Sequence, residues 1–285
     1  THQVMAGWGL VPANVAFPLA SEYVNKALEL DPHVGSAWAS LAGLEDTWQW
    51  NRKRAEEYYR KAIALEPNNS STHQWYAEFL CTQGRFEEAL EQIEMARLID
   101  PLAMVVRTVK AWIHYYMGDY DLAIAECERM IEQDPDFTGT YKVLADACRH
   151  GGHDDRAAAV YARYFEASVP GAGQAIENAY QSSGMDGVIR VVISGKRQVY
   201  LAGEQYISPS SIAIDFASIG EADSAMIWFD RACETRAFPI TYIAVTPDCE
   251  PIHDDPRFID LLVRVHLDHV IPAYAKLQST RRAGG

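Results

Sequence analysis

A proline that follows an acidic residue recurs along the first half of the chain at nearly constant spacing. The prolines lie 35, 34 and 34 residues apart, at Pro32, Pro67, Pro101 and Pro135. Proline cannot continue a helix beyond its first turn, and the residue before a proline disfavours helical geometry. The spacing therefore predicts a repeating helical unit that ends at each proline.

Small residues hold fixed places in the same register. Alanine stands twelve residues before and ten residues after each proline, and glycine stands seventeen residues after the last three. A glycine adopts the left-handed backbone that ends a helix, and an alanine lets two helix axes approach closely. Each unit is therefore predicted to be a pair of helices joined by a turn. The residues are Ala20, Ala55, Ala89, Ala123, Ala42, Ala77, Ala111, Ala145, Gly84, Gly118 and Gly152.

This pattern resembles the tetratricopeptide repeat, whose period is about 34 residues. One hairpin cannot bury its apolar face alone, so neighbouring hairpins must stack. The resemblance implies an all-α fold, a right-handed superhelical solenoid of stacked helical hairpins with a C-terminal capping helix. We expect five regular repeats over 1–171, a degenerate helical pair or joint over 172–206, a further repeat over 207–240, and a loop, a capping helix and a frayed tail over 241–285.

Two details guide the expected boundaries within this scheme. Residues 191–193, Val-Val-Ile, are β-prone but lie between helical patterns, so we expect them to be helical. The capping helix is predicted to open at Asp255-Pro256 and to run to about His269. Its apolar residues, Phe258, Leu261, Leu262 and Val265, would cover the open end of the array.

Two segments resemble a narrower group, the C-terminal repeat region of bacterial multidomain signalling proteins. The first segment is the Trp48-Gln-Trp50 turn, which replaces the expected glycine, and the second is the tail with Ser208-Pro209 and residues 255–258, Asp-Pro-Arg-Phe. In that group the repeats follow an adenylate cyclase, a winged-helix transcriptional regulator or a protein kinase domain. We find no part of such a domain in this sequence, so the resemblance implies a non-enzymatic regulatory or scaffolding module.

The charge of the chain argues against two classes of partner. The net charge is −14, from 25 basic and 39 acidic residues. Nucleic-acid binding depends on neutralising phosphates with Lys and Arg, so neither nucleic acid nor an anionic membrane is an expected partner. The five cysteines include no C-x-x-C pair and fall mostly in helical patterns. We read them as reduced, mostly buried thiols and expect a cytoplasmic protein.

The first helices of this repeat family line a concave groove, and matching the register predicts which side chains face it. A tryptophan near tyrosine and arginine is typical of a binding hot spot, although core packing of Trp112 remains an equal alternative. The family's clamp for a C-terminal carboxylate needs Lys and Asn where this chain has other residues, so that mode of capture is not expected. The candidate groove residues are Gln74, Trp75, Glu78, Thr108, Trp112, Tyr115, Lys142, Asp146 and Arg149.

Neither catalysis nor a cofactor is predicted. The glycine pairs follow no strand, and no pattern supplies the base and the oxyanion hole that a nucleophilic serine needs. Histidine and aspartate cluster at 150–155 and 253–255, and His266 and His269 would share one helical face, but none of these sets supplies four ligands. We therefore expect solvated turns and no native metal.

The sequence thus favours a protein-interaction or regulatory module. Its partner would be a protein or peptide segment, or another domain of the same chain. Two alternatives stay open: a small-molecule-sensing domain, with a pocket near 171–206, that controls an attached catalytic domain, and a module that makes the parent protein a homodimer.

Overall fold

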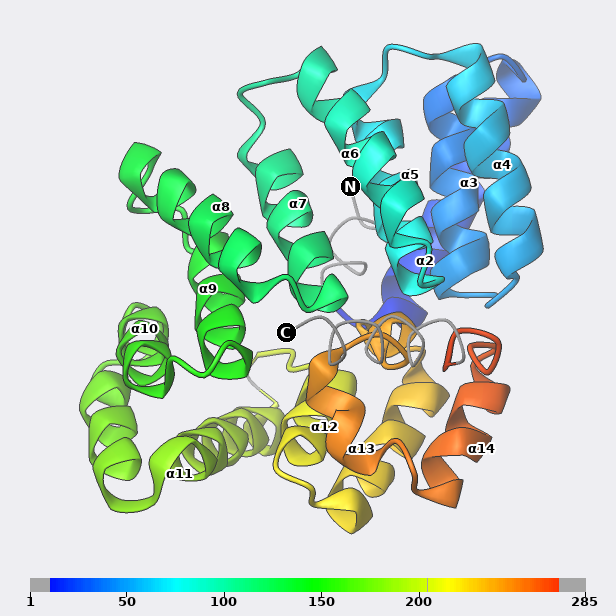
Figure 1. Ribbon diagram of the computed structural model, residues 1–285. Coiled ribbons are helices and arrows are strands. Elements are labelled where there is room, and N and C mark those ends of the chain that lie inside the picture. The colour runs from blue at the N-terminus through cyan, green and yellow to red at the C-terminus, as the bar shows by residue number, and fades with distance from the viewer. Residues whose placement is uncertain (1–10, 204, 272–285) are drawn as a thin grey trace. The chain divides into compact units, whose positions relative to one another are not determined.

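The computed structural model describes residues 11–203 and 205–271, and every regular element in these ranges is a helix (Figure 1). Consecutive helices pair as antiparallel hairpins, which confirms the predicted all-α stack of hairpins. The chain forms two compact units. The first unit contains the described residues up to Pro101 together with those from Val199 onward, and the second unit contains Leu102–Gln198.

The first unit begins with five helices that follow the predicted register. Each second helix ends one residue before an acidic residue whose extended or near-extended backbone leads into the proline. Side chains of Asn51 and Asn69 cap the next helices by accepting from backbone N–H groups of Arg54 and Thr72. The helices are α2 (Ala13–Leu30), α3 (Gly35–Thr47), α4 (Arg52–Leu65), α5 (Ser70–Thr82) and α6 (Phe86–Ile99).

Left-handed backbone joins the helices of each hairpin. Gly84, between α5 and α6, has a φ of 69°, as a glycine turn requires. Between α3 and α4 the register has no glycine, and Trp50 adopts the same conformation with a φ of 57°. A side chain in this region is sterically disfavoured, so Trp50 is held there by its surroundings.

The C-terminal part of the first unit is a further hairpin followed by short turns of helix. The hairpin consists of α12 (Pro209–Ser218) and α13 (Ala222–Thr235). Two 3₁₀ helices, η1 (Ile240–Tyr242) and η2 (Pro247–Ile252), occupy the segment expected to be a loop. The last helix, α14 (Pro256–Arg264), buries Phe258, Leu261 and Leu262 completely, and Phe258 packs on Phe229 of α13 at a ring distance of 6.0 Å.

The prediction that this last helix reaches His269 is wrong. The helix ends at Arg264, because His266 takes a left-handed backbone with a φ of 58° that no α-helix can contain. Val265 and Leu267 remain fully buried beyond the end, so apolar periodicity continues where the helix does not. His266 and His269 therefore do not share a helical face. Residues 1–10 of the first predicted repeat and the predicted tail at 281–285 lie outside the described residues.

The second unit continues the hairpin pattern and contains α11 up to Gln198. Helices α7 to α10 form two hairpins, and α11 is a pair of helices that meet at Gly184, whose φ of 64° and ψ of −155° interrupt the helix. Residues 191–193 are helical. The helices are α7 (Met104–Met117), α8 (Tyr120–Gln133), α9 (Gly139–His150), α10 (Asp154–Glu166) and α11 (Ala172–Ala202).

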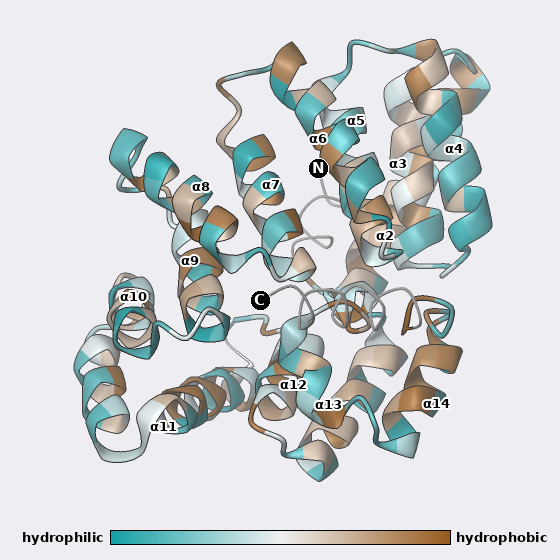
Figure 2. Cartoon of the chain, in the orientation of Figure 1, coloured by the Kyte–Doolittle hydropathy of each residue, from teal (hydrophilic) through white to brown (hydrophobic). Residues whose placement is uncertain are grey.

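The cores are built around the small residues of the repeat register. In the second unit Ala111, Ala123 and Ala157 are completely buried in one cluster with Cys127 and Met130. Helix axes can approach only where such side chains meet. Figure 2 shows the resulting two-sidedness, with hydrophobic and hydrophilic residues on the same helices. All five cysteines are free thiols, and four of them are buried.

Candidate partner-binding surface

The candidate groove residues fall in both units, and each set is described within its own unit. Gln74, Trp75 and Glu78 lie on α5 of the first unit, where Gln74 is buried and the other two are partly buried. The amide of Gln74 donates to the Glu78 carboxylate at 2.9 Å. Burial raises the pKa of Glu78 to about 7, and the charge of Asp46 adds to this rise, while the Gln74 hydrogen bond opposes it. Glu78 therefore titrates near neutral pH.

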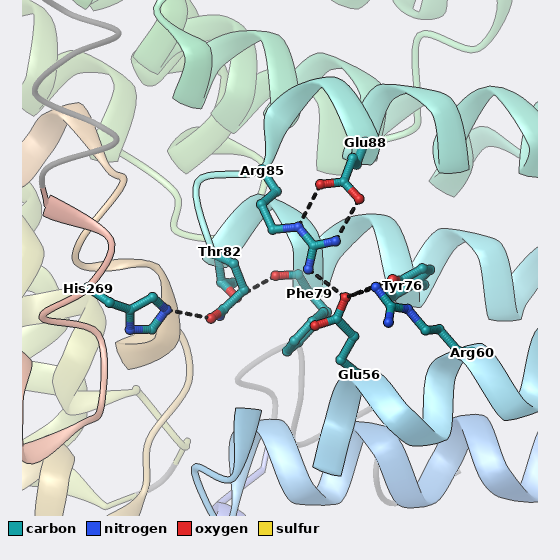
Figure 3. A network of polar contacts seen from close by, with 9 residues as sticks. Glu56, Arg60, Tyr76, Phe79, Thr82, Arg85, Glu88 and His269 are labelled. Carbon is teal, nitrogen blue, oxygen red and sulfur yellow. Dashed lines mark hydrogen bonds and ion pairs between the residues drawn. The ribbon is translucent and has the colours of Figure 1, made fainter. Parts of the chain in front are cut away.

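A network of ion pairs holds α5 between its neighbours in the first unit (Figure 3). Arg85, in the turn after α5, donates a hydrogen bond of 2.6 Å to the Glu56 carboxylate on α4. It also donates to both carboxylate oxygens of Glu88 on α6, at 2.6 and 2.7 Å. Glu56 also accepts from Arg60 at 2.7 Å and from the Tyr76 hydroxyl at 3.2 Å. Three helices are thus tied through one carboxylate, which keeps the first-helix residues of α5 in place.

In the second unit, Thr108 and Tyr115 contribute to the core rather than to an open surface. Thr108 is completely buried, and its hydroxyl donates to the Met104 carbonyl oxygen at 3.0 Å. Tyr115 is 4% exposed and packs against Tyr116 and His150, with ring distances of 5.2 and 5.7 Å. Trp112 is partly buried against the same core. Its partial burial does not decide between core packing and a groove-facing role.

Helix α9 carries the charged part of the candidate surface. The Lys142 ammonium contacts the Asp146 carboxylate at 2.5 Å, and the Tyr161 hydroxyl of α10 donates to the other oxygen of Asp146. Burial alone would raise the pKa of Asp146, but the positive charges of Lys142 and Arg149 and the hydrogen bonds outweigh it and hold that pKa below its usual range. Asp146 is therefore a fixed anion that orients Lys142.

His150 ends this cluster as a neutral ring. Burial lowers its pKa to about 3, and the neighbouring Arg149 contributes to the shift. Arg149 accordingly donates to His150 Nε2 at 3.0 Å. Trp112, Lys142 and Arg149 are each partly buried, and Lys142 and Arg149 are oriented by their contacts with Asp146 and His150.

A second polar cluster lies in the first unit, and sequence reasoning missed it. We call it the Trp50 cluster: Trp50, Arg52, Arg236 and His266. The Arg236 guanidinium lies 3.5 Å from the centre of the Trp50 ring, and His266 Nδ1 donates to the Trp50 carbonyl oxygen at 3.0 Å. Arg52 donates to the carbonyl oxygen of Val265 at 3.3 Å and pairs with the Asp46 carboxylate. The sequence signal that could have indicated it was the absence of a glycine in the turn between α3 and α4. Without a glycine, another residue of that turn must adopt the left-handed backbone.

The predicted histidine clusters do not assemble into a metal centre in the part of the chain that the structure describes, where no three His, Cys, Asp or Glu side chains gather closely enough to hold an ion. His266 and His269 instead contact different residues. His269 Nε2 donates to the Gln83 side-chain oxygen at 3.0 Å, so both histidines fasten the C-terminal segment to turns of the early repeats. Among the described residues, no helix combines the length and apolar character that a membrane crossing requires.

Comparison with known proteins agrees with this architecture. Two family models described as tetratricopeptide repeat match the chain, at residues 51–113 and 108–172. The chain is a tetratricopeptide-repeat protein. The matched regions begin at the turn after α3 and end at the start of α11. They include the ion-pair network around Glu56 and the charged residues of α9, Lys142, Asp146, Arg149 and His150, which we call the α9 cluster.

Relatives of this tetratricopeptide-repeat protein come from two kinds of bacterial protein. It is 34% identical over 97 residues to the type IV pilus assembly protein PilF of Pseudomonas aeruginosa, covering 30% of this chain and 38% of that protein. It is 31% identical over 120 residues to the transcriptional regulator HilA of Salmonella typhimurium, covering 42% of this chain and 22% of that protein. The chain thus spans less than half the length of either relative.

The solved structure of PilW, described as a widely conserved type IV pilus biogenesis factor, has the same kind of fold. It superimposes with a TM-score of 0.52 at 21% identity and covers 66% of this chain and 86% of that one. At this level of identity the likeness concerns the fold alone.

Proposed function

We propose that this chain is a protein-binding regulatory scaffold, the repeat region of a larger cytoplasmic bacterial signalling protein such as a transcriptional regulator or an adenylate cyclase. The α9 cluster carries the proposal, because Asp146 holds the partly exposed Lys142 in one orientation within the same unit as the partly buried Trp112. An anchored cation costs little entropy to order when a partner binds. The likeness to the transcriptional regulator HilA supports the signalling context.

The proposed partner is a polypeptide segment with acidic and apolar side chains. Lys142 and Arg149 would pair with carboxylates, and the Trp112 ring would take an apolar or aromatic side chain. The segment belongs either to another protein or to another domain of the same parent chain. The protein itself contributes no chemical step in this proposal.

Paired substitutions in the parent protein test the surface. We expect Trp112→Ala with Lys142→Ala to weaken binding of the partner at least tenfold, about 1.4 kcal/mol or more, while helical circular dichroism stays unchanged. A matched control is Leu122→Ala with Arg129→Ala on α8, since both residues are exposed. Equal losses in the two double variants, or loss of the fold in the first one, would contradict the assignment.

A further inference from the structure

The Trp50 cluster has two properties that its role as an internal contact does not explain. The first is backbone strain. Three residues other than glycine have a left-handed backbone in the part of the chain that the structure describes. They are Trp50, Arg236 and His266, with φ values of 57°, 53° and 58°. All three meet in this one cluster, although they come from the turn after α3, the end of α13 and the segment after α14. Strained residues persist where function or dense packing holds them.

The second property is a set of buried donors without acceptors. Trp50 Nε1, Arg52 Nε and Arg236 Nη1 are each buried and have no hydrogen-bond partner. Trp50 as a whole is only 7% exposed. A buried donor left unpaired costs about 1–3 kcal/mol. Arg236 contacts Trp50, and Arg52 lies two residues after Trp50 in the chain, so the three unpaired donors belong to one small cluster that contains too few acceptors.

The charge of the cluster indicates what that acceptor is. Arg52 and Arg236 bring two positive charges, and Asp46 supplies one negative charge through its ion pair with Arg52. Burial lowers the pKa of Arg236, and the charge of Arg52 lowers it further, so the two guanidinium groups repel each other. One negative charge is therefore missing. A monoanion would balance the cluster, whereas a dianion would leave it with a net negative charge away from water.

We propose that the Trp50 cluster is a binding site for a carboxylate, held by the indole N–H of Trp50 and the guanidinium groups of Arg52 and Arg236. A carboxylate carries a single charge, and its two oxygens can accept from a guanidinium and an indole N–H together. Arg236 is half-buried and its guanidinium stacks on the Trp50 ring. The proposal concerns different residues from the α9 cluster and does not depend on it.

The site joins parts of the chain that are distant in sequence. Arg52 and Trp50 belong to an early repeat, whereas Arg236 follows α13. A carboxylate bound between them strengthens the attachment of the C-terminal segment to that repeat. This gives a physical basis to the small-molecule-sensing alternative, at a place other than the 171–206 region where the sequence had suggested a pocket.

Titration of the ¹⁵N-labelled protein with sodium acetate at constant ionic strength tests the proposal. The chain has seven tryptophans, so the indole N–H region of the spectrum is sparse, and the signal missing in Trp50→Phe is that of Trp50. We expect this signal to move downfield and to saturate, because the indole gains an acceptor. Acetamide, which has the same shape without the charge, should leave it in place, and phosphate should bind more weakly than acetate.

Variants separate a built site from a general ion effect. Arg236→Gln should require about tenfold more acetate for the same shift, because a charge-assisted hydrogen bond is lost. Arg264→Gln is the control, since this exposed arginine pairs with Asp230 on the surface of the same unit, and its titration should match that of the wild type. Helical circular dichroism establishes beforehand that each variant is folded, and Trp50→Phe preserves an aromatic ring for the stacking.

The source of the carboxylate follows from a second titration. Tighter binding of N-acetylalanine than of acetate would indicate the carboxyl terminus of a chain, and similar binding would indicate a free small acid. The proposal is overturned if the Trp50 signal does not move, if acetamide moves it equally, or if Arg236→Gln and Arg264→Gln respond alike.

Discussion

The side-chain amide of Gln74 donates a hydrogen bond of 2.9 Å to the Glu78 carboxylate, one helical turn further along α5. This bond favours the ionised form of Glu78, but burial and the nearby charge of Asp46 favour the protonated form more strongly, so the pKa rises to about 7. The ionisation of Glu78, a residue predicted to face a partner, is thus set near neutral pH by burial, by Asp46 and by Gln74.

The raised pKa of Glu78 predicts a pH-dependent stability. Because the folded-state pKa of about 7 exceeds the ordinary value of 4.5, the folded protein binds more protons than the unfolded chain between these values. Stability from this group is complete at low pH and falls as the pH rises through 7. Glu78→Gln should therefore stabilise the protein at pH 8 by about 1–2 kcal/mol, discounted for partial exposure, and by much less at pH 5.

Urea unfolding of both proteins at pH 5 and pH 8 measures this difference. Glu91→Gln, an exposed acid on α6, serves as the control and should change little at either pH. A stabilisation by Glu78→Gln that is equal at both pH values would show that packing, not ionisation, is responsible.

Two arginines that share the Glu56 carboxylate should differ in their effects. Arg85 bridges three elements and has a side chain 30% exposed, whereas Arg60 pairs within α4 and is 66% exposed. We expect Arg85→Gln to cost about 1–2 kcal/mol and Arg60→Gln less than about 0.5 kcal/mol, because exposed pairs on one helix contribute little. Chemical denaturation measures both, and equal costs would refute a special role for the bridging arginine.

Turn glycines should resist substitution for backbone reasons alone. Gly152 has a φ of 79°, and a methyl group added to it would meet no atom within 4 Å. Gly152→Ala should therefore cost about 1–2 kcal/mol through the left-handed backbone. Gly195 is equally open but helical, so Gly195→Ala should be neutral or stabilise by up to about 1 kcal/mol. Thermal denaturation distinguishes the two, and opposite signs are the expected result.

The small residues of the register should not tolerate enlargement. Ala157 is completely buried in the core of the second unit, and Ala159, two residues further along α10, is exposed. Ala157→Leu should destabilise the protein by about 1–3 kcal/mol or more, because the added atoms separate packed helices. Ala159→Leu should stay within about 0.5 kcal/mol of the wild type. Comparable melting temperatures for the two variants would contradict the packing role.

The sequence was sufficient to predict the hairpins, because the same residues determine each of them. Pro101 prevents α6 from continuing, Gly84 allows the turn before α6, and the small side chain of Ala96 lets the neighbouring helix pack closely. Each of these effects depends on one residue and its immediate surroundings. Backbone and packing requirements of this kind recur in every repeat, so one copy could be checked against the others.

The Trp50 cluster could not be predicted in the same way. Arg52 and His266 donate hydrogen bonds to the backbone carbonyl oxygens of Val265 and Trp50. Because every residue has a backbone carbonyl group, the sequence does not indicate which one will accept such a bond. The end of α14 at Arg264 could not be predicted either, because Leu267 beyond it is apolar and buried, as a residue of a continuing helix would be. Among the candidate groove residues, the register could not tell that Thr108 and Asp146 are buried.

The hydrogen bond from Arg52 to Val265 spans 213 residues. During synthesis, the early hairpins leave the ribosome long before their C-terminal contacts exist, because local helix pairs form quickly and distant contacts form last. The first unit therefore acquires its complete structure only after nearly the whole chain has been made. A chain that stops before α14 would keep its early repeats helical, yet it would lack the contacts that Val265 and His266 make with Arg52 and with the backbone of Trp50.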